Sequence, residues 1–454
     1  MWTIVFTSDF YDELVEFLFS TKSENGCFLL AKSYQNGDEN TMIILEVLKP
    51  QNDSWNKKGA HSLEPSSSFI NQCVVAADVK NASLIFVHTH PHSMHPSGFS
   101  WIDEKSNQQI FTNLSQILPD IPLGSLVFSR KGICGVTYSE EKIESVSKIK
   151  IVGKRLEIFP GVGFEKEANE VSEKYDRQVR MIGKKNQSLI GELKIAIVGV
   201  GGTGSPLAVQ LSRIGAKQLS LIDLDKIDET NIPRVYGSIE SDIGKPKTEV
   251  MKNHIQSYSD CKIDTHNIDI TKEDLSFLLD SDIIFSCTDN LTSRSVLNEI
   301  SNQYCIPLID VGCRIHLNED EIHQAIVKVQ IVTPDHACLW CTGTLDGRII
   351  MQESLPEDEK EGLREEGYLD EVEKQPSIIS MTTMGASMAV NKLLSLLGVF
   401  GENYSSKSQI EIKDGFMIEE NPEIKSDCIC RKNLGKAEKY SKITPKKSFA
   451  TGTS

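Results

Sequence analysis

The chain has 454 residues, of which 39% are apolar and 25% charged, as in ordinary globular proteins, and this length allows two or three domains. Its formal net charge of −16 argues against a general nucleic-acid binder, because binding to phosphates needs clustered basic surface. The first residues lack the basic region of a signal peptide, and apolar runs such as 392–400 are too short to span a bilayer. Eleven cysteines fit a reducing compartment better than disulfides. We therefore expect a cytoplasmic protein without a membrane partner.

Residues 1–145 are predicted to form an α+β domain that holds a metal motif. An apolar run at 83–87 predicts a strand that delivers His88 and His90, and residues two apart on a strand point to the same side. Asp103 stands at the start of a predicted helix and returns a carboxylate to the same place. Three protein ligands with an open fourth position are typical of a catalytic zinc, whose bound water becomes a nucleophile near neutral pH. His92 and His95 could compete as ligands.

Two further side chains complete a predicted hydrolytic site. Glu24, just before an apolar run, is the expected general base, and Ser100 is the expected donor to the oxyanion that forms on the attacked carbonyl. The order of Glu24, His88-x-His90-Pro91 and Ser100-x-x-Asp103 resembles the JAMM/MPN (JAB) metalloisopeptidase family. This resemblance implies a zinc-dependent hydrolase of peptide or isopeptide bonds. A solvated histidine-rich loop, or an MPN fold that has lost its metal, is the alternative.

The pattern changes after a charged stretch at 146–170, which we expect to be a linker. Short apolar runs at 194–199, 219–223, 282–287 and 307–312 alternate with helical spacings. Continuous apolar strands between helices indicate a parallel sheet covered on both faces. We therefore predict an α/β protein in which a Rossmann-like domain at 171–432 follows the first domain. The remaining residues, 433–454, are polar and lysine-rich, and we expect them to be a disordered tail.

A glycine-rich segment follows the first strand of the predicted parallel sheet and opens a helix. It contains Gly199, Gly201, Gly202 and Gly204, and glycines at such a turn let backbone amides approach a phosphate. Alone, this pattern also suits NAD or FAD, with Asp223 as the acid that binds the ribose. The loops after the predicted strands add Asp225, Asn231, Arg234, Lys247 and Asp289. Basic side chains with a carboxylate for magnesium favour ATP chemistry over hydride transfer.

Several motifs of this region occur in one order across roughly residues 170–432. They are YDRQ at 175–178, GVGGTGS, D-x-D-x-I with N-x-x-R, G-x-x-K, and TDN before Arg294. Together they resemble the ThiF/MoeB superfamily of ubiquitin-activating-enzyme-like adenylyltransferases. The resemblance implies that Asp223 or Asp225 holds the ribose, that Asn231, Arg234 and Lys247 face the phosphates of ATP, and that Asp289 holds Mg²⁺. It also implies a homodimer in which Arg177 acts at the nucleotide of the other subunit. A Rossmann-like sheet kept for structure alone is the alternative.

Two cysteine pairs predict a second metal site. Cys338 with Cys341, and Cys428 with Cys430, can form a tetrahedral cage of four thiolates around a structural zinc, and the superfamily has a comparable zinc. Unligated surface cysteines and a redox C-x-x-C are the alternatives. The segment 342–398 contains no cysteine, and Cys313 and Cys287 are by default buried thiols. We therefore expect adenylation without a stable thioester on this chain.

The two resemblances imply one bifunctional enzyme that acts on the Gly-Gly-type C-terminus of a ubiquitin-like or sulfur-carrier protein. The first domain would trim or release that terminus, and the second would adenylate it with ATP, in a bacterial ubiquitin-like modification pathway that also uses a conjugating enzyme or a sulfurtransferase. One alternative is the activation of a sulfur carrier for the biosynthesis of a cofactor or metabolite. Another is a non-catalytic scaffold that only binds partners, and a nicotinamide or flavin oxidoreductase is a more distant one.

Overall fold

The computed structural model describes residues 1–51, 53–59, 63–92, 98–130, 132–139, 142–161, 172–318, 321–365, 376–401 and 403–438. The chain forms two compact units, which are described separately: the first comprises mainly Met1–Val171 and the second mainly the residues from Ser172 to Lys432. Among the described residues, no helix has the length and apolar character needed to cross a membrane. Residues 439–454 of the expected tail and 162–171, at the end of the expected linker, lie outside these ranges.

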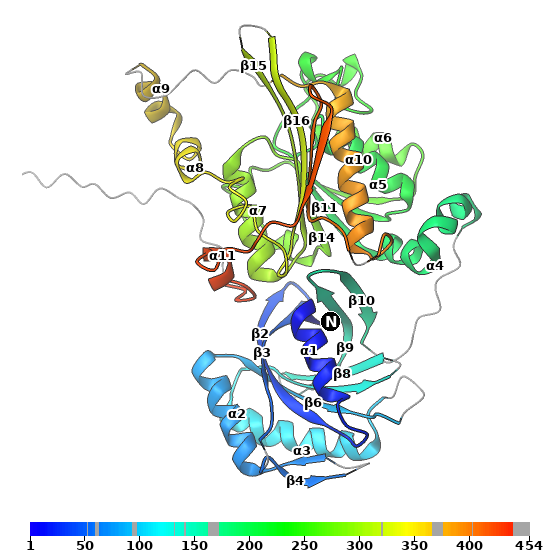
Figure 1. Ribbon diagram of the computed structural model, residues 1–454, viewed down its shortest axis with the longest axis vertical. Coiled ribbons are helices and arrows are strands. Elements are labelled where there is room, and N and C mark those ends of the chain that lie inside the picture. The colour runs from blue at the N-terminus through cyan, green and yellow to red at the C-terminus, as the bar shows by residue number, and fades with distance from the viewer. Residues whose placement is uncertain are drawn as a thin grey trace, which may run out of the picture. The chain divides into compact units, whose positions relative to one another are not determined.

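The first unit is built on an eight-stranded mixed sheet in the order β1-β3-β2-β6-β7-β8-β9-β10, and an additional pairing of β1 with β9 makes it barrel-like. Its strands are β1 (Trp2–Thr7), β2 (Gly26–Asn36), β3 (Glu39–Leu48), β6 (Ser83–Thr89), β7 (Leu123–Ser129), β8 (Gly132–Ser139), β9 (Lys142–Val152) and β10 (Leu156–Pro160), beside a small separate pair, β4 (Trp55–Lys58) and β5 (Leu63–Pro65). These strands are coloured blue to cyan-green in Figure 1.

Three helices supply the rest of the core of this unit. Helix α1 (Ser8–Leu18) buries Leu14 and Leu18 in a cluster with β1, β2 and β9. Helices α2 (Ser67–Lys80) and α3 (Trp101–Ile117) bury Phe69 and Phe111 in a second cluster with β2 and β6. The helices and the mixed sheet agree with the predicted α+β class, whereas the MPN-type identity of this unit stays a prediction.

The interpretation of residues 146–160 as a linker is wrong, because they form β9 and β10 of the first sheet. Strand β9 pairs in parallel with β1, and Val146, Ile149 and Ile151 are fully buried. From Lys148 onward, Lys148 and Lys150 alternate with Ile149 and Ile151 and are only partly buried; a register shift separates them from Val146. This period of two is that of an amphipathic strand, whose charged residues gave the segment its linker-like composition.

The second unit contains another eight-stranded sheet, in the order β13-β12-β11-β14-β15-β16-β17-β18. Strands β13 to β15 of that order are parallel to one another, as predicted, and the last three are antiparallel additions. The strands are β11 (Lys194–Val198), β12 (Gln218–Ile222), β13 (Lys262–His266), β14 (Ile283–Ser286), β15 (Leu308–Asn318), β16 (Glu321–Val332), β17 (Lys407–Glu411) and β18 (Phe416–Glu420).

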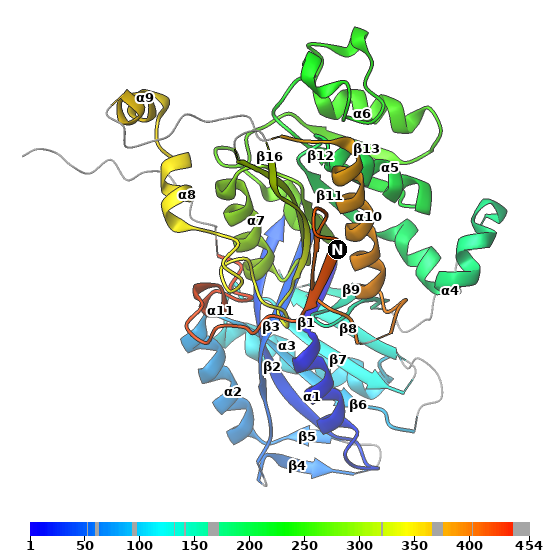
Figure 2. The same ribbon diagram turned by 45° about the horizontal axis from the view of Figure 1, so that its top comes forward.

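Helices cover both faces of this second sheet, which explains why its strands are continuously apolar. Figures 1 and 2 show α5 (Gly204–Ile214) and α10 (Ile379–Leu396) on one face and α7 (Leu291–Tyr304) on the other. The remaining helices are α4 (Asp176–Glu192), α6 (Lys247–Gln256), α8 (Gly347–Glu353), α9 (Glu357–Glu365) and α11 (Ile429–Lys432), with short 3-10 turns η1 (Glu173–Tyr175), η2 (Glu229–Asn231), η3 (Glu240–Asp242) and η4 (Ser276–Asp280).

The order of the strands places a switch point beside β11. Strand β12 follows β11 along the chain and pairs on one side of it, whereas β14 pairs on the other side. The connections leave in opposite directions at this point, and in such sheets ligands bind in the crevice at the carboxyl ends of the strands. The glycine-rich segment after β11 lies at this edge.

Candidate functional site

The three predicted ligands of the hydrolytic site come together in the first unit. His88 ends β6, His90 follows it, and Asp103 lies in the first turn of α3; one ligand atom from each lies within 4.8 Å of the others. His88 Nε2 and His90 Nε2 are 3.2 and 3.4 Å from the two carboxylate oxygens of Asp103. Two ligands of a tetrahedral zinc, each bound at about 2.0 Å, lie about 3.3 Å apart. The spacing therefore fits a zinc ion.

The orientation of His88 supports the same interpretation. Both of its ring nitrogens are buried, and neither has a hydrogen-bond partner among the described residues, although Nε2 lies 3.2 Å from the Asp103 carboxylate. Ligands that converge on a common ion approach one another without hydrogen-bond geometry, and a buried imidazole without a partner is otherwise costly. Burial alone would raise the pKa of Asp103, but the neighbouring His88 and His90 hold it far below its ordinary value.

Ser100 positions the Asp103 carboxylate. Its backbone N–H and its hydroxyl both donate to Asp103 Oδ2 at 2.7 Å, and Asp103 N donates back to Ser100 Oγ at 3.3 Å. This capping box begins α3 and fixes the carboxylate beside the two imidazoles. Because the single hydroxyl hydrogen of Ser100 is already engaged, its predicted donation to an oxyanion requires the hydroxyl to rotate away from Asp103.

Glu24 lies in the loop before β2 and is 8% exposed. Its neighbour Asn25 is tied to the end of β6, since Asn25 N donates to Thr89 Oγ1 and Thr89 N donates to Asn25 O, both at 3.0 Å. Burial raises the pKa of Glu24 to about 7, an effect that His90 opposes and Asp103 reinforces. A group with that pKa can exchange a proton near neutral pH. His92 is exposed, and His95 lies outside the described residues.

The glycine-rich segment of the second unit packs closely at some positions and is open at others. An ideal Cβ on Gly204, the first residue of α5, would lie 2.9 Å from the carbonyl carbon of Gly199 and closer still to its oxygen. A Cβ on Gly199 would lie 2.6 Å from Cys287 O, so the segment also contacts the loop after β14. At Gly201 a Cβ would meet nothing within 4 Å. The open backbone there leaves room for a phosphate.

Two carboxylates lie next to this segment. Asp223, after β12, accepts hydrogen bonds from Val200 N at 2.6 Å and Asp225 N at 2.8 Å. Burial raises the pKa of Asp223, and Lys247 together with these backbone donors opposes the rise. Lys247 Nζ, at the start of α6, is 2.7 Å from Asp225 Oδ2. The predicted lysine and both predicted ribose-binding acids therefore lie at one edge of the sheet.

The other predicted nucleotide residues lie in adjoining loops. Arg234 contacts the glycine segment, since a Cβ on Gly202 would lie 3.3 Å from Arg234 Cδ. Asn231 is buried; its Nδ2 donates to Asp228 Oδ1 at 2.8 Å, and its Oδ1 has no partner in the part of the chain that the structure describes. Asp289 is exposed in the loop between β14 and α7, and Arg177 is exposed at the start of α4. The roles of these residues toward ATP, Mg²⁺ and a second subunit stay predictions.

The structure also places polar residues at this edge that we did not predict. Arg294 Nη1 is 3.2 Å from the fully buried Asp310 carboxylate on β15, although the motif pointed only to the arginine. Glu353, at the end of α8, accepts hydrogen bonds from Leu291 N and Thr292 N at 3.1 and 2.7 Å and so caps α7. No local pattern links residues that are about sixty positions apart.

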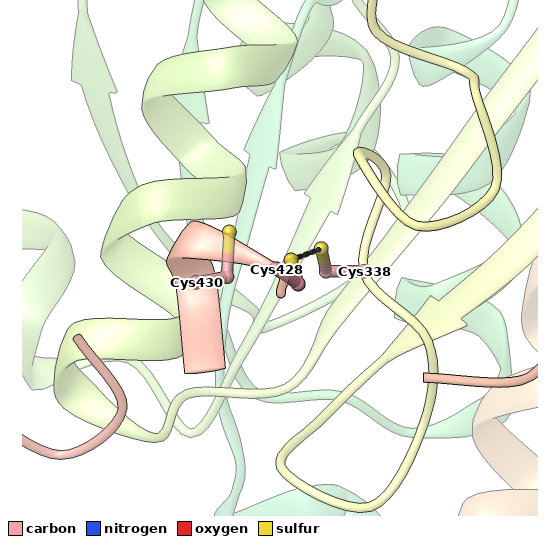
Figure 3. Close-up of side chains that lie close together, drawn as sticks. All are labelled: Cys338, Cys428 and Cys430. Atoms are coloured by element: carbon pink, nitrogen blue, oxygen red, sulfur yellow. Dashed lines mark hydrogen bonds between the residues drawn. The ribbon is translucent and has the colours of Figure 1, made fainter. Parts of the chain in front are cut away.

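The four predicted zinc-binding cysteines are all buried in the second unit. Cys338 Sγ is 3.4 Å from Cys428 Sγ and 3.7 Å from Cys341 Sγ, and Cys338, Cys428 and Cys430 form a group within 4.8 Å (Figure 3). Thiolates bound at about 2.3 Å in a tetrahedral zinc site lie about 3.8 Å apart. Asn298 Nδ2 donates to Cys430 Sγ at 3.2 Å, and its Oδ1 accepts from Leu339 N at 2.9 Å. Cys338, Cys428 and Cys430 therefore fit a structural zinc with a supporting outer contact, whereas Cys341 contacts Cys338 but lies outside this group of three.

Cys313 is packed against α10. Its thiol donates to Met381 O at 3.6 Å, and burial raises its pKa to about 11 although Thr203 and Arg294 favour the thiolate. A thiol in this environment is a poor nucleophile, although Cys313 is only partly buried and not fully buried as predicted.

Known activating enzymes share part of this sequence. The chain is 31% identical over 242 residues to the ubiquitin-like modifier-activating enzyme 5 of Drosophila persimilis (50% of this chain, 57% of that protein). It is 31% identical over 135 residues to the adenylyltransferase and sulfurtransferase MOCS3 of Aedes aegypti (29% and 31%) and 28% identical over 152 residues to the SUMO-activating enzyme subunit 2 of Dictyostelium discoideum (33% and 23%). The chain thus spans from about a quarter to somewhat more than half of these relatives.

Among solved structures, the chain is similar to E. coli MccB crystallised with MccA-N7isoASN, with a TM-score of 0.47 and 21% identity over 60% of this chain and 77% of that one. The ThiF family model matches residues 175–432, which is more than half of the chain and includes the whole parallel sheet, the glycine-rich segment and the four cysteines. The chain therefore belongs to the ThiF family.

Proposed function

We propose that the second unit uses ATP to adenylate the C-terminal carboxylate of a ubiquitin-like or sulfur-carrier protein. The observation that supports this proposal is the grouping of residues at the carboxyl end of β11. There the open backbone at Gly201 lies near Asp223, Asp225 and Lys247. Its relatives are named as activating enzymes for SUMO or ubiquitin-like modifiers and as an adenylyltransferase and sulfurtransferase.

In the proposed reaction, an oxygen of the acceptor carboxylate attacks the α-phosphorus of ATP. A new O–P bond forms, the bond from the α-phosphorus to the bridging oxygen breaks, and pyrophosphate leaves. Both reactants are anions, so the enzyme must hold them in line and neutralise charge. The amides of the glycine-rich segment, Arg234 and Lys247 would bind phosphate oxygens. Asp289 would hold Mg²⁺, which supplies charge neutralisation when bound.

The test is ATP–pyrophosphate exchange with a purified partner protein that ends in Gly-Gly. Exchange should depend on the partner and should be lost in Lys247→Ala and in Asp289→Ala. Lys245→Ala is the matched control, because Lys245 lies two residues from Lys247 but is 55% exposed and paired with Asp242. Wild-type protein without partner-dependent exchange, or undiminished exchange in both variants, would contradict the proposal.

We propose separately that the first unit is a JAMM-type zinc hydrolase of peptide or isopeptide bonds at the same terminus. His88, His90 and Asp103 would hold the ion, which supplies a polarised water when bound. Glu24 would accept the proton of that water, and the capping box of Ser100 keeps the Asp103 carboxylate in place. A partner with a C-terminal extension should be trimmed by wild-type protein. Glu24→Gln should retain zinc but not trim, whereas His88→Ala should lose both; trimming that resists a chelator contradicts the proposal.

The two proposed activities would serve one peptide terminus in a cytoplasmic modification pathway of the bacterial type, in which a conjugating enzyme takes over the activated partner. Their presence on one chain would raise the effective concentration of the second site for a shared partner. In the proposed homodimer, Arg177 acts at the nucleotide of the other subunit. Arg177→Ala should therefore lower ATP–pyrophosphate exchange, and mixing it with Lys247→Ala protein should restore part of the exchange, because one site of each mixed dimer then has both residues.

Sulfur transfer is the second function that an observation favours. The relative MOCS3 is named as an adenylyltransferase and sulfurtransferase, and the segment 342–398 of this chain has no cysteine for a thioester. Formation of a thiocarboxylate on the partner would support sulfur transfer, whereas transfer of the partner to a lysine would support conjugation. Bound zinc together with ATP turnover would exclude a scaffold that only binds partners.

A further inference from the structure

Two basic side chains flank a glycine on one face of the second sheet. Asp310 and Gly312 on β15 are paired with Gln330 and Lys328 on β16. Residues two apart on a strand, and their direct cross-strand partners, share a face of the sheet. Arg294, in the first turn of α7, reaches this face: its Nη1 is 3.2 Å from Asp310 Oδ2, and a Cβ on Gly312 would lie 3.4 Å from the same nitrogen. Gly312 thus separates the guanidinium of Arg294 from Lys328.

The charges on this face are not balanced. Arg294 uses four of its hydrogens, on Thr288 O twice, on Val311 O and on Asp310, so that one hydrogen of Nη1 remains for another acceptor. Lys328 Nζ donates to the neutral hydroxyl of Thr344 at 2.8 Å. Asp310, already engaged with Arg294, is the carboxylate that attracts Lys328, and burial still lowers the pKa of Lys328 to about 8. Arg294 and Lys407, the latter paired with Glu420, also disfavour the charge on Lys328, so a partly buried excess of positive charge remains among the described residues. Such an excess is costly unless an anion joins it.

The position of this face connects it with the proposed nucleotide site. The carbonyl that holds Arg294 belongs to Thr288, directly before Asp289. The glycine-rich segment contacts the same loop, since a Cβ on Gly199 would lie 2.6 Å from Cys287 O and 3.1 Å from Thr288 N. One short loop, 287–289, therefore joins the expected phosphate site and Mg²⁺ ligand to Arg294, the first of the two basic side chains beside Gly312.

We propose that Lys328 and Arg294, on either side of Gly312, bind the C-terminal carboxylate of the acceptor protein and position it for attack on ATP. This inference rests on the proposed adenylyltransferase function and names the acceptor-binding residues of that site. Because Gly312 has no side chain, the Arg294 guanidinium lies directly over the backbone of β15, beside the cross-strand partner Lys328, so the two cations can address one small terminal group. Lys328 and Arg294 are positioning residues, and the acceptor class is a flexible peptide terminus ending in glycine.

The first measurement is direct binding, which needs no turnover. A fluorescent peptide ending in Gly-Gly with a free carboxylate should bind wild-type protein at least about tenfold more tightly than its C-terminal amide, because a hydrogen bond to a charged group is worth that much. Lys328→Met should reduce this preference, since Arg294 alone remains, and Lys328→Arg should restore part of it. Gly312→Ala should weaken carboxylate binding, since the added methyl group would lie 3.4 Å from Arg294 Nη1 and obstruct an oxygen that approaches it.

The second measurement is the KM for each substrate in ATP–pyrophosphate exchange. Lys328→Met should raise the KM for the acceptor by roughly 10- to 100-fold and leave the KM for ATP within about twofold. In wild-type protein the acceptor KM should rise between pH 7 and pH 9 as Lys328 loses its proton, and this rise should vanish in the variant. Lys392→Met is the matched control: Lys392 is also buried in this unit, but it binds Ser405 O and Glu419.

These measurements separate the two ideas. Wild-type protein without acceptor-dependent exchange overturns the proposed function, whereas an active wild type whose Lys328→Met and Lys328→Gln variants keep both the acceptor KM and the carboxylate preference overturns the role of Lys328. An equal loss in Lys392→Met would mean that the effect is one of folding, and the inference would again fail. The melting temperature of each variant shows whether it is folded.

Discussion

Substitution of Gly204 by alanine tests the proposed nucleotide site most directly. The added Cβ would overlap the Gly199 carbonyl, whose carbon it approaches to 2.9 Å. Because carbon and carbonyl oxygen ordinarily stay about 3.3 Å apart, α5 or the glycine-rich segment has to move by the order of 1 Å. Overpacking of this kind costs about 3 kcal/mol at the upper end of its range. For a unit of this size that corresponds to a melting temperature roughly 6–12 °C lower.

Gly201→Ala is the informative counterpart. Nothing lies within 4 Å of the Cβ that it adds, so the free protein should melt as wild type does. If the phosphates of ATP approach the open backbone there, the same methyl group should obstruct them. Gly362→Ala, inside α9, also adds a Cβ with no described neighbour within 4 Å; it should stabilise that helix by up to about 1 kcal/mol and leave ATP binding unchanged.

Thermal melting with and without saturating ATP and Mg²⁺ distinguishes the three variants, since a ligand that binds only the folded state raises the melting temperature. We expect a lower melting temperature without an ATP-induced rise for Gly204→Ala. For Gly201→Ala we expect a normal melting temperature with a reduced rise. For Gly362→Ala we expect a melting temperature that is not lowered and a normal rise. A normal ATP response of Gly201→Ala would refute the inference that phosphates bind at the open backbone, and a normal Gly204→Ala would refute the packing argument.

Three further outcomes follow from the geometry. Burial lowers the pKa of Lys328 from 10.5 to about 8, so the unfolded chain binds the proton of Lys328 more strongly than the folded protein does. The charged lysine therefore lowers the free energy of unfolding by its full amount below pH 8 and no longer lowers it at pH 10.5. Lys328→Met should therefore have a higher free energy of unfolding than wild type near pH 7, by up to about 3 kcal/mol, and this difference should disappear toward pH 10.5. Urea unfolding measures it at each pH, and a difference that does not change with pH would contradict the lowered pKa. Asn298→Ala removes the donor to Cys430 Sγ and should weaken zinc retention against a chelator by roughly 10- to 100-fold, with zinc bound at His88 as the internal control. Glu353→Ala removes the cap of α7 and should destabilise it by about 1 kcal/mol, seen as faster hydrogen exchange of Leu291 and Thr292, whereas the exposed Glu359→Ala in α9 should have no such effect.

Local patterns were sufficient to predict the parts of the molecule that carry the candidate sites. The apolar run 194–198 and the glycines after it predict a buried strand and a tight turn into a helix, because both are consequences of neighbouring residues. Ser100 and Asp103 likewise lie three apart, and their capping box needs no distant partner. His88 near the end of β6 and His90 directly after that strand bring both imidazoles to one place for the same reason.

Long-range contacts explain what the sequence did not predict. Strand β9 joins the first sheet by pairing with β1, more than 140 residues earlier, and nothing within 146–160 identifies that partner. The cap of α7 by Glu353 and the cross-strand pair of Gly312 with Lys328 depend in the same way on which elements become neighbours. Lysines in particular were interpreted as solvated charges, whereas burial of Lys328 follows only from the position of β16 inside the sheet.

Both candidate sites are formed where a strand ends and a helix begins, but one suits a positively charged ligand and the other a negatively charged one. Helix α3 begins with a capping box and two acidic residues in its first turn, so its amides are satisfied and a carboxylate is left for a cation. Helix α5 has no side-chain cap and no acidic residue in its first turn, so its amides and dipole remain for an anion.

Thr203, at the N-cap of α5, allows this difference to be tested. Thr203→Asp places a carboxylate where we expect phosphate, so the helix should be unchanged or slightly more stable while the ATP-induced rise in melting temperature should shrink. Thr203→Ser keeps an uncharged side chain of similar size and should retain the full rise. An undiminished response to ATP in Thr203→Asp would show that the amides at the start of α5 do not bind the triphosphate. Other groups in the crevice would then have to attract this anion.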